Sequence, residues 1–114
     1  MKTLDRIHLE ANEQAVIRKA ADRLRSELPV SRVILFGSKA RGTATADSDV
    51  DLLVLTKCPL TSDLRRRISE IVFEEGLAGD LSLTSVAASE EDWQTGLLSL
   101  LCIRKEVDRD GCEI

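Results

Sequence analysis

Two aspartates and a glycine-serine pair lie between two apolar runs of the sequence. Asp49 and Asp51 are two positions apart at the start of the second run, and Gly37 and Ser38 directly follow the first. Side chains at positions i and i+2 of a strand project to one face, so both carboxylates should point the same way. A glycine-containing turn after a strand can present backbone N–H groups to a phosphate. The stretch therefore predicts an anion-binding turn beside two ligands for a hard cation.

A third carboxylate, Asp80, opens a later segment in which apolar and polar residues alternate. If the strands are neighbours, Asp80 meets Asp49 and Asp51 at one end of a sheet. Oxygen ligands without a nearby histidine or cysteine are typical of Mg²⁺, and two such ions can stabilise an in-line displacement at phosphorus. Two carboxylates on one face also repel each other unless a cation compensates them. We therefore expect phosphoryl or nucleotidyl transfer, with Glu74 or Glu75 as rivals of Asp80.

Hydrophobic periodicity and turn residues indicate the elements that must position these groups. We expect helices over about Asn12 to Glu27 and from Thr61 or Ser62 to Glu75, and strands over Val30 to Phe36, Asp49 to Thr56 and Asp80 to Val86. The nearly continuous apolar character of the second strand predicts cover on both faces, as in an α/β sheet. The pattern therefore indicates an α/β fold in a single domain, residues 1–114.

The last third of the chain predicts a further helix and a charged tail. A capping box at residues 89–92 precedes a helix that contains Trp93, Leu97 and Leu101, and Gly96 either interrupts this helix or splits it. We expect the apolar side chains to pack in the core, with a partner or dimer surface as the alternative. The Asp110-Gly111 pair is typical of a turn, so we expect residues 112–114 to form a short edge strand or a frayed end.

Composition excludes several classes of function. The chain has 114 residues, of which 43% are hydrophobic, and its net charge of −4 argues against a nucleic-acid binder that relies on a basic surface. Three cysteines without C-x-x-C spacing and a single histidine predict neither a disulfide framework nor a zinc site. The sequence shows no signal peptide and no apolar segment long enough to cross a membrane. We expect a cytoplasmic protein with a protein or small-molecule partner.

Two linked motifs resemble the signature of a known family. The sequence G-S-K-A-R-G at residues 37–42, followed by S-D-V-D-L at residues 48–52, is similar to the G-S-x-A-R-G and S-D-x-D-L motifs of DNA polymerase β-like nucleotidyltransferases. The length and the order of elements resemble the minimal nucleotidyltransferase branch. This resemblance implies the polymerase β-like fold, a small mixed β-sheet with flanking helices. Arg41, inside the first motif, is left open between a phosphate contact and a structural ion pair.

The resemblance also implies roles for the polar residues. Gly37 and Ser38 would hold the triphosphate of ATP, the donor substrate. Asp49 and Asp51 would bind two Mg²⁺ ions, and Asp80 would be the third carboxylate, a metal ligand that helps to deprotonate the acceptor hydroxyl.

Minimal nucleotidyltransferases are often antitoxins of type VII pairs with a HEPN-domain toxin. The resemblance implies transfer of AMP from ATP to a tyrosine of that toxin. Larger relatives carry added domains that hold the acceptor, and this chain has no room for one, so we expect another molecule to present the hydroxyl. Two alternatives remain open: nucleotidyl transfer to a small-molecule hydroxyl such as that of an antibiotic, and a non-catalytic antitoxin that masks its partner. A homo-oligomer and a hetero-oligomer are both compatible with the sequence.

Overall fold

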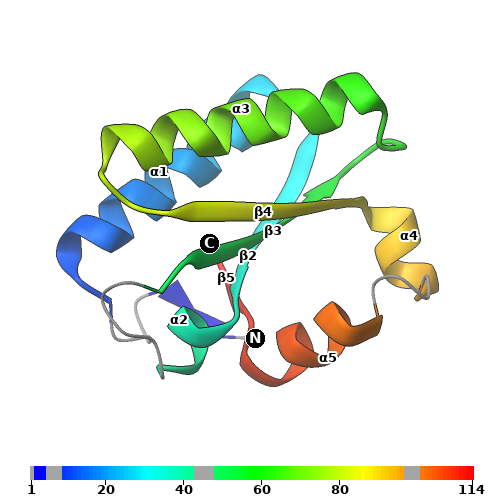
Figure 1. Cartoon of the computed structure of the whole chain (residues 1–114). Coiled ribbons are helices and arrows are strands. Elements are labelled where there is room, and N and C mark those ends of the chain that lie inside the picture. Colours follow the sequence, from blue (N-terminus) through cyan, green and yellow to red (C-terminus); the bar gives the residue numbers. More distant parts are fainter. Residues whose placement is uncertain (1, 5–8, 43–47, 97–100) are drawn as a thin grey trace.

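The computed structural model describes residues 2–4, 9–42, 48–96 and 101–114. Within these ranges the strands form a mixed sheet in the order β1-β5-β2-β3-β4, with helices on both faces (Figure 1). The elements are β1 (Lys2–Thr3), α1 (Ala11–Glu27), β2 (Val30–Phe36), α2 (Ser38–Arg41), β3 (Val50–Thr56), α3 (Ser62–Ala78), β4 (Leu83–Ser89), α4 (Glu90–Thr95), α5 (Leu101–Asp110) and β5 (Cys112–Glu113). The predicted α/β class is confirmed.

Strand β3 lies inside the sheet and buries apolar side chains on both faces. Val50, Leu52 and Val54 belong to the core cluster beneath α1 and α3, whereas Leu53 and Leu55 belong to a second cluster on the opposite face. This second cluster contains residues of α4 and α5, which lie below the sheet in Figure 1. Cover on both faces explains the continuous apolar run of β3, as the sequence predicted.

The register of the sheet brings the polar residues to one end. Strands β2 and β3 are antiparallel and pair Phe36 with Asp51, so the end of β2 meets the beginning of β3. Strands β3 and β4 are parallel and pair Asp51 with Thr84. The turn after β2 and the starts of β3 and β4 therefore lie at the same end of the sheet.

The two long helices differ from the prediction only at their ends. Helix α1 begins at Ala11 because Glu10, rather than Asn12, is the N-cap and forms a capping box with Glu13. Helix α3 begins at Ser62, one of the two expected starts, with Thr61 as its N-cap, but it continues beyond the expected end at Glu75 through Gly76 to Ala78. A side chain at Gly76 would lie 2.7 Å from the carbonyl oxygen of Leu81, so this glycine permits close packing rather than ending the helix.

The predictions for the last third were partly right. Gly96 splits the expected helix, because it adopts a left-handed conformation and ends α4. Trp93 is buried in the second core cluster, as expected, and Leu97 lies outside the described residues. The short final strand exists, but the expectation that it lies at an edge was wrong. Strand β5 pairs with both β1 and β2.

The predicted start of the third strand at Asp80 was also wrong. Strand β4 begins at Leu83, and Asp80 lies in the preceding turn with a positive φ of 52°. No helix in the described parts of the chain is long and apolar enough to cross a membrane.

A half-buried ion pair joins β2 to the start of α4. The Arg32 guanidinium donates two hydrogen bonds to the carboxylate of Glu90, at 2.8 and 3.2 Å. The hydrogen bond from Arg32 lowers the pKa of Glu90 below its usual 4.5, against the opposing effect of burial. The carboxylate form of Glu90 is therefore stabilised by folding.

This ion pair predicts a contribution to stability that depends on pH. We expect Glu90→Gln to lower the free energy of unfolding by about 1–2 kcal/mol at pH 7, because a charge-assisted hydrogen bond is lost. Since folding lowers the pKa of Glu90, this contribution is complete above about pH 4.5 and disappears as the pH falls through the folded-state pKa. Urea unfolding of both proteins between pH 3 and about pH 7 measures the difference.

Glu91→Gln is the matched control, because Glu91 is exposed and lies in the same first helical turn. It removes the same charge near the helix N-terminus but leaves Arg32 paired. A difference between wild type and Glu90→Gln that does not change with pH would contradict the assignment.

Candidate active site

Two aspartates stand at the beginning of β3 on the face opposite α1 and α3. Asp51 is half-buried and Asp49 is exposed. The hydroxyl of Thr84 donates a hydrogen bond to Oδ1 of Asp51, and the hydroxyl of Ser82 donates one to Oδ1 of Asp49, each at 2.7 Å. In the part of the chain that the structure describes, neither aspartate has an ion-pair partner. The two negative charges are therefore held by neutral donors.

Gly37 lets the turn after β2 approach Asp51. Its backbone has φ 80° and ψ −158°, a conformation that is essentially restricted to glycine. A Cβ at this position would overlap with Oδ2 of Asp51. The sequence predicted that Gly37 would serve a phosphate-binding turn, and the structure gives it a close packing contact with Asp51 as well.

Helix α2 is fixed to α1 by a buried ion pair. The Nζ atom of Lys39 lies 2.6 Å from Oε2 of Glu13, and the two side chains are only 7% and 13% exposed. Burial raises the pKa of Glu13, but the hydrogen bond and charge of Lys39 and the N–H of Glu10 outweigh it, so the pKa is lowered. This ion pair holds Ser38, the neighbour of Lys39, in place beside the end of β2.

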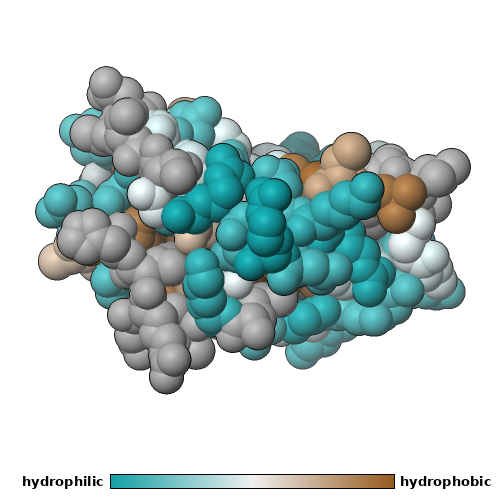
Figure 2. Space-filling view, turned by 90° about the horizontal axis from the view of Figure 1, so that it is seen from below, coloured by the Kyte–Doolittle hydropathy of each residue, from teal (hydrophilic) through white to brown (hydrophobic). Residues whose placement is uncertain are grey.

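Arg41 forms an ion pair with α5. Its guanidinium lies 3.4 Å from the carboxylate of Glu106, which favours the structural alternative for this residue. The exposed residues of α5 are mostly charged, and the underside of the molecule is largely hydrophilic in its described part (Figure 2). The ion pair therefore lies at a solvated surface, where such pairs contribute little to stability.

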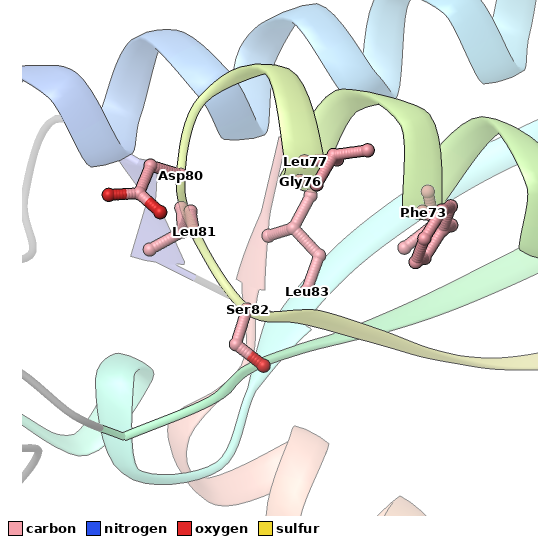
Figure 3. A pocket seen from close by; sticks show the side chains of 8 residues that line it. Phe73, Gly76, Leu77, Asp80, Leu81, Ser82 and Leu83 are labelled. Carbon is pink, nitrogen blue, oxygen red and sulfur yellow. The ribbon is translucent and has the colours of Figure 1, made fainter.

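Asp80 lines a groove between the end of α3 and the start of β4. The groove has a volume of about 280 Å³, and its apolar lining includes the exposed side chains of Phe73 and Leu77 (Figure 3). In Figure 3 the Asp80 side chain points away from Ser82, which is the contact of Asp49. The described residues contain no group of three histidine, cysteine or acidic side chains that could hold a metal ion. The structure thus does not gather Asp80 with the two aspartates.

The residues present fit a Mg²⁺ ion without a third carboxylate. Mg²⁺ usually binds proteins through one or two carboxylates and completes its octahedron with water and substrate phosphate. Asp49 and Asp51 provide this number of carboxylates, and the hydrogen bonds from Ser82 and Thr84 engage only Oδ1 of each. The donor set, two unneutralised carboxylates at an accessible sheet end, suits a hard cation.

Ser82 and Thr84 were missed as site residues by sequence reasoning. Their signal was the alternation of polar and apolar residues from position 80 to 86, which puts alternate side chains on one face. The alternation alone does not identify their partners, because the partners depend on the register with β3.

Known proteins are similar to this chain in sequence and in fold. A family model described as a nucleotidyltransferase domain matches residues 17–99. The curated relative "Probable protein adenylyltransferase MntA" of Haemophilus influenzae is 25% identical over 109 residues, which cover 96% of this chain and 93% of that protein.

Two solved structures support the same fold. A toxin-antitoxin crystal structure with AMP-PNP matches with a TM-score of 0.58 and 24% identity, covering 88% of this chain and 70% of that chain. A structure of the tri-AMPylated HEPN toxin of Shewanella oneidensis in complex with an MNT antitoxin matches with a TM-score of 0.56 and 22% identity, covering 89% of this chain and 70% of that chain. The fold implied by the two sequence motifs is confirmed.

The contact of Gly37 with Asp51 predicts a local effect of a single methyl group. We expect Gly37→Ala to lower the free energy of unfolding by about 2–3 kcal/mol, because its backbone conformation is strained for alanine. The methyl group also displaces the Asp51 carboxylate. Chemical unfolding measures the stability, and the carboxyl ¹³C NMR signal of Asp51 reports the displacement.

Gly42→Ala is the control for backbone strain. Gly42 also has a positive φ, 78°, but among the described residues no atom lies within 4 Å of the position of an added Cβ. We expect Gly42→Ala to lower the free energy of unfolding by only about 1 kcal/mol and to leave the carboxyl ¹³C signal of Asp51 unchanged. An unchanged Asp51 signal in Gly37→Ala would show that the turn does not constrain this carboxylate.

Proposed function

This chain belongs to the nucleotidyltransferase domain family, and we propose that it is a Mg²⁺-dependent protein adenylyltransferase that acts as the antitoxin of a HEPN-domain toxin. The observation that carries the proposal is the pair of Asp49 and Asp51 at the start of β3, with Asp51 packed against the turn at Gly37. In this reaction a tyrosine hydroxyl of the toxin attacks the α-phosphorus of ATP, its proton is removed, and pyrophosphate leaves.

Each part of the site has a role in this proposal. The bound Mg²⁺ ions would neutralise charge on the phosphates and stabilise the attacking and leaving oxygens. Asp49 and Asp51 would hold these ions, and Gly37 and Ser38 would bind the triphosphate through the turn after β2. Asp80 stays a prediction as third ligand and proton acceptor, and the geometry of its turn gives that role no support.

The proposed donor and acceptor rest on relatives rather than on a visible acceptor pocket. The name of the Haemophilus influenzae relative supports adenylyl transfer to a protein. The AMPylated HEPN toxin bound to an MNT antitoxin is an example, in a protein of the same fold, of the pairing that we propose. The acceptor hydroxyl would then be presented by the partner protein at the open end of the sheet.

Radiolabelled ATP tests the reaction directly. The purified chain and Mg²⁺ are incubated with the HEPN-domain toxin that is proposed as its partner. We expect label in the toxin from [α-³²P]ATP but not from [γ-³²P]ATP, because adenylyl transfer retains only the α-phosphate. Removal of Mg²⁺ by EDTA should abolish labelling, and mass spectrometry should locate AMP on tyrosine. Absence of label from the α-position would overturn the proposed activity.

Amide variants test the two carboxylates. We expect Asp49→Asn and Asp51→Asn each to lower the labelling rate at least a hundredfold, because each removes a charged metal ligand while keeping side-chain size. Glu91→Gln, an exposed carboxylate far along the chain on α4, should label at the wild-type rate. If the Asp49→Asn/Asp51→Asn double variant still protects cells from the toxin fully, the chain acts by masking its partner instead of modifying it.

A further inference from the structure

Two hydroxyls at the start of β4 repeat the spacing of the two aspartates at the start of β3: Ser82 and Asp49 directly precede their strands, and Thr84 and Asp51 lie within them. Ser82 contacts Asp49 and Thr84 contacts Asp51, and each contact joins residues 33 positions apart. The parallel pairing of β3 with β4 places each hydroxyl beside its aspartate. Asp51 pairs with Thr84, and the Val50 N–H donates a hydrogen bond to the Ser82 carbonyl at 2.9 Å. The two contacts are therefore a consequence of the parallel register.

A carboxylate that binds a metal must keep its plane in a fixed orientation. The terminal torsion of aspartate is broad when nothing restrains it. At Asp51 the Thr84 hydroxyl holds Oδ1, and the α-carbon of Gly37 packs against Oδ2. The carboxylate is thus restrained from both sides, and the restraint is stronger than at exposed Asp49, for which the described contact is the single hydrogen bond from Ser82.

Threonine suits this task better than a flexible side chain. Its branched Cβ restricts the first side-chain torsion, so the hydroxyl stays directed at its acceptor. Thr84 Oγ1 also lies 3.5 Å from the carbonyl oxygen of Val50, on the same neighbouring strand. Outer hydrogen bonds of this kind orient metal ligands, and their loss typically weakens metal binding by about 10-fold to 100-fold.

We propose that Thr84, with Ser82 in a lesser part, is a positioning residue that orients the Asp51 and Asp49 carboxylates toward a divalent cation bound with the nucleotide. This inference rests on the proposed function, since it concerns the metal site of that reaction. It assigns the support of the aspartates to hydroxyl groups of β4, the positions directly beside them in the sheet.

The test measures cation binding without any acceptor. Mn²⁺, a spectroscopic substitute for Mg²⁺, is titrated into the purified chain with the non-reactive analogue α,β-methylene-ATP and followed by electron paramagnetic resonance. We expect Thr84→Val, which keeps the shape of the side chain but lacks the hydroxyl, to raise the half-saturating Mn²⁺ concentration roughly tenfold. Thr84→Ser keeps the hydroxyl and should bind Mn²⁺ within about twofold of wild type, which a purely structural role of the side chain would not predict.

A matched pair of serine variants distinguishes the loss of a hydroxyl at the site from a general effect of substitution on β4. Ser82→Ala should weaken Mn²⁺ binding by about threefold, whereas Ser85→Ala, the same change on the opposite face of β4, should leave it unchanged. Circular dichroism confirms that each variant is folded. Wild-type affinity in folded Thr84→Val, or an equal loss in Thr84→Ser, would overturn the inference.

The outcome is separable from that of the proposed function. If the toxin is not labelled but Thr84→Val still weakens Mn²⁺ binding, adenylyl transfer to the toxin fails and the positioning role stands. If labelling succeeds while Mn²⁺ binding in Thr84→Val equals wild type, the proposed function stands and the positioning role fails.

Discussion

The antiparallel register between β2 and β3 is the constraint on which the site depends. It pairs Phe36 with Asp51, and so places Gly37 against the Asp51 carboxylate. Because side chains alternate along a strand, a slip of one residue would turn Asp51 into the apolar layer beneath α1 and α3. An unpaired carboxylate there would lose its hydration without compensation, which is strongly unfavourable. Burial of β3 on both faces therefore fixes the register and, with it, the direction of both aspartates.

The site lies where α4 and α5 no longer cover their face of the sheet. Leu53 and Leu55 follow Asp51 on the same face and are covered by Trp93 of α4 and Val107 of α5. Asp49 and Asp51 lie beyond this cover, so one is exposed and the other half-buried. The same alternation thus produces a core at one end of β3 and an accessible pair of carboxylates at the other.

The bounds of β2 and the positions of the two aspartates were predictable because their signals are local. Val30–Phe36 was predicted with its exact bounds, since Pro29 and Gly37 flank a β-branched apolar run. Asp80 was misplaced because the alternating pattern of β4 continues backward into a turn, where positive φ cannot be read from alternation.

Contacts between elements that are distant in the sequence could not be predicted from local sequence patterns. The pairing of Arg41 with Glu106 could not be inferred, because Glu106 was expected to lie in a charged tail, whereas it belongs to α5. The contacts of Ser82 and Thr84 could be predicted only from the register of two strands that are separated by a helix.

These contacts between distant elements also explain how the site keeps its negative charge. Lys39 and Arg41 follow the turn closely, yet Glu13 and Glu106 engage them. A cation bound directly to Asp51 would compete with an incoming metal ion, whereas a neutral hydroxyl orients the carboxylate and leaves its charge available. Lys39 and Arg41 are thus paired with other carboxylates, and the aspartates are supported by hydroxyls, which is consistent with the proposed binding of a divalent cation together with a polyanionic nucleotide.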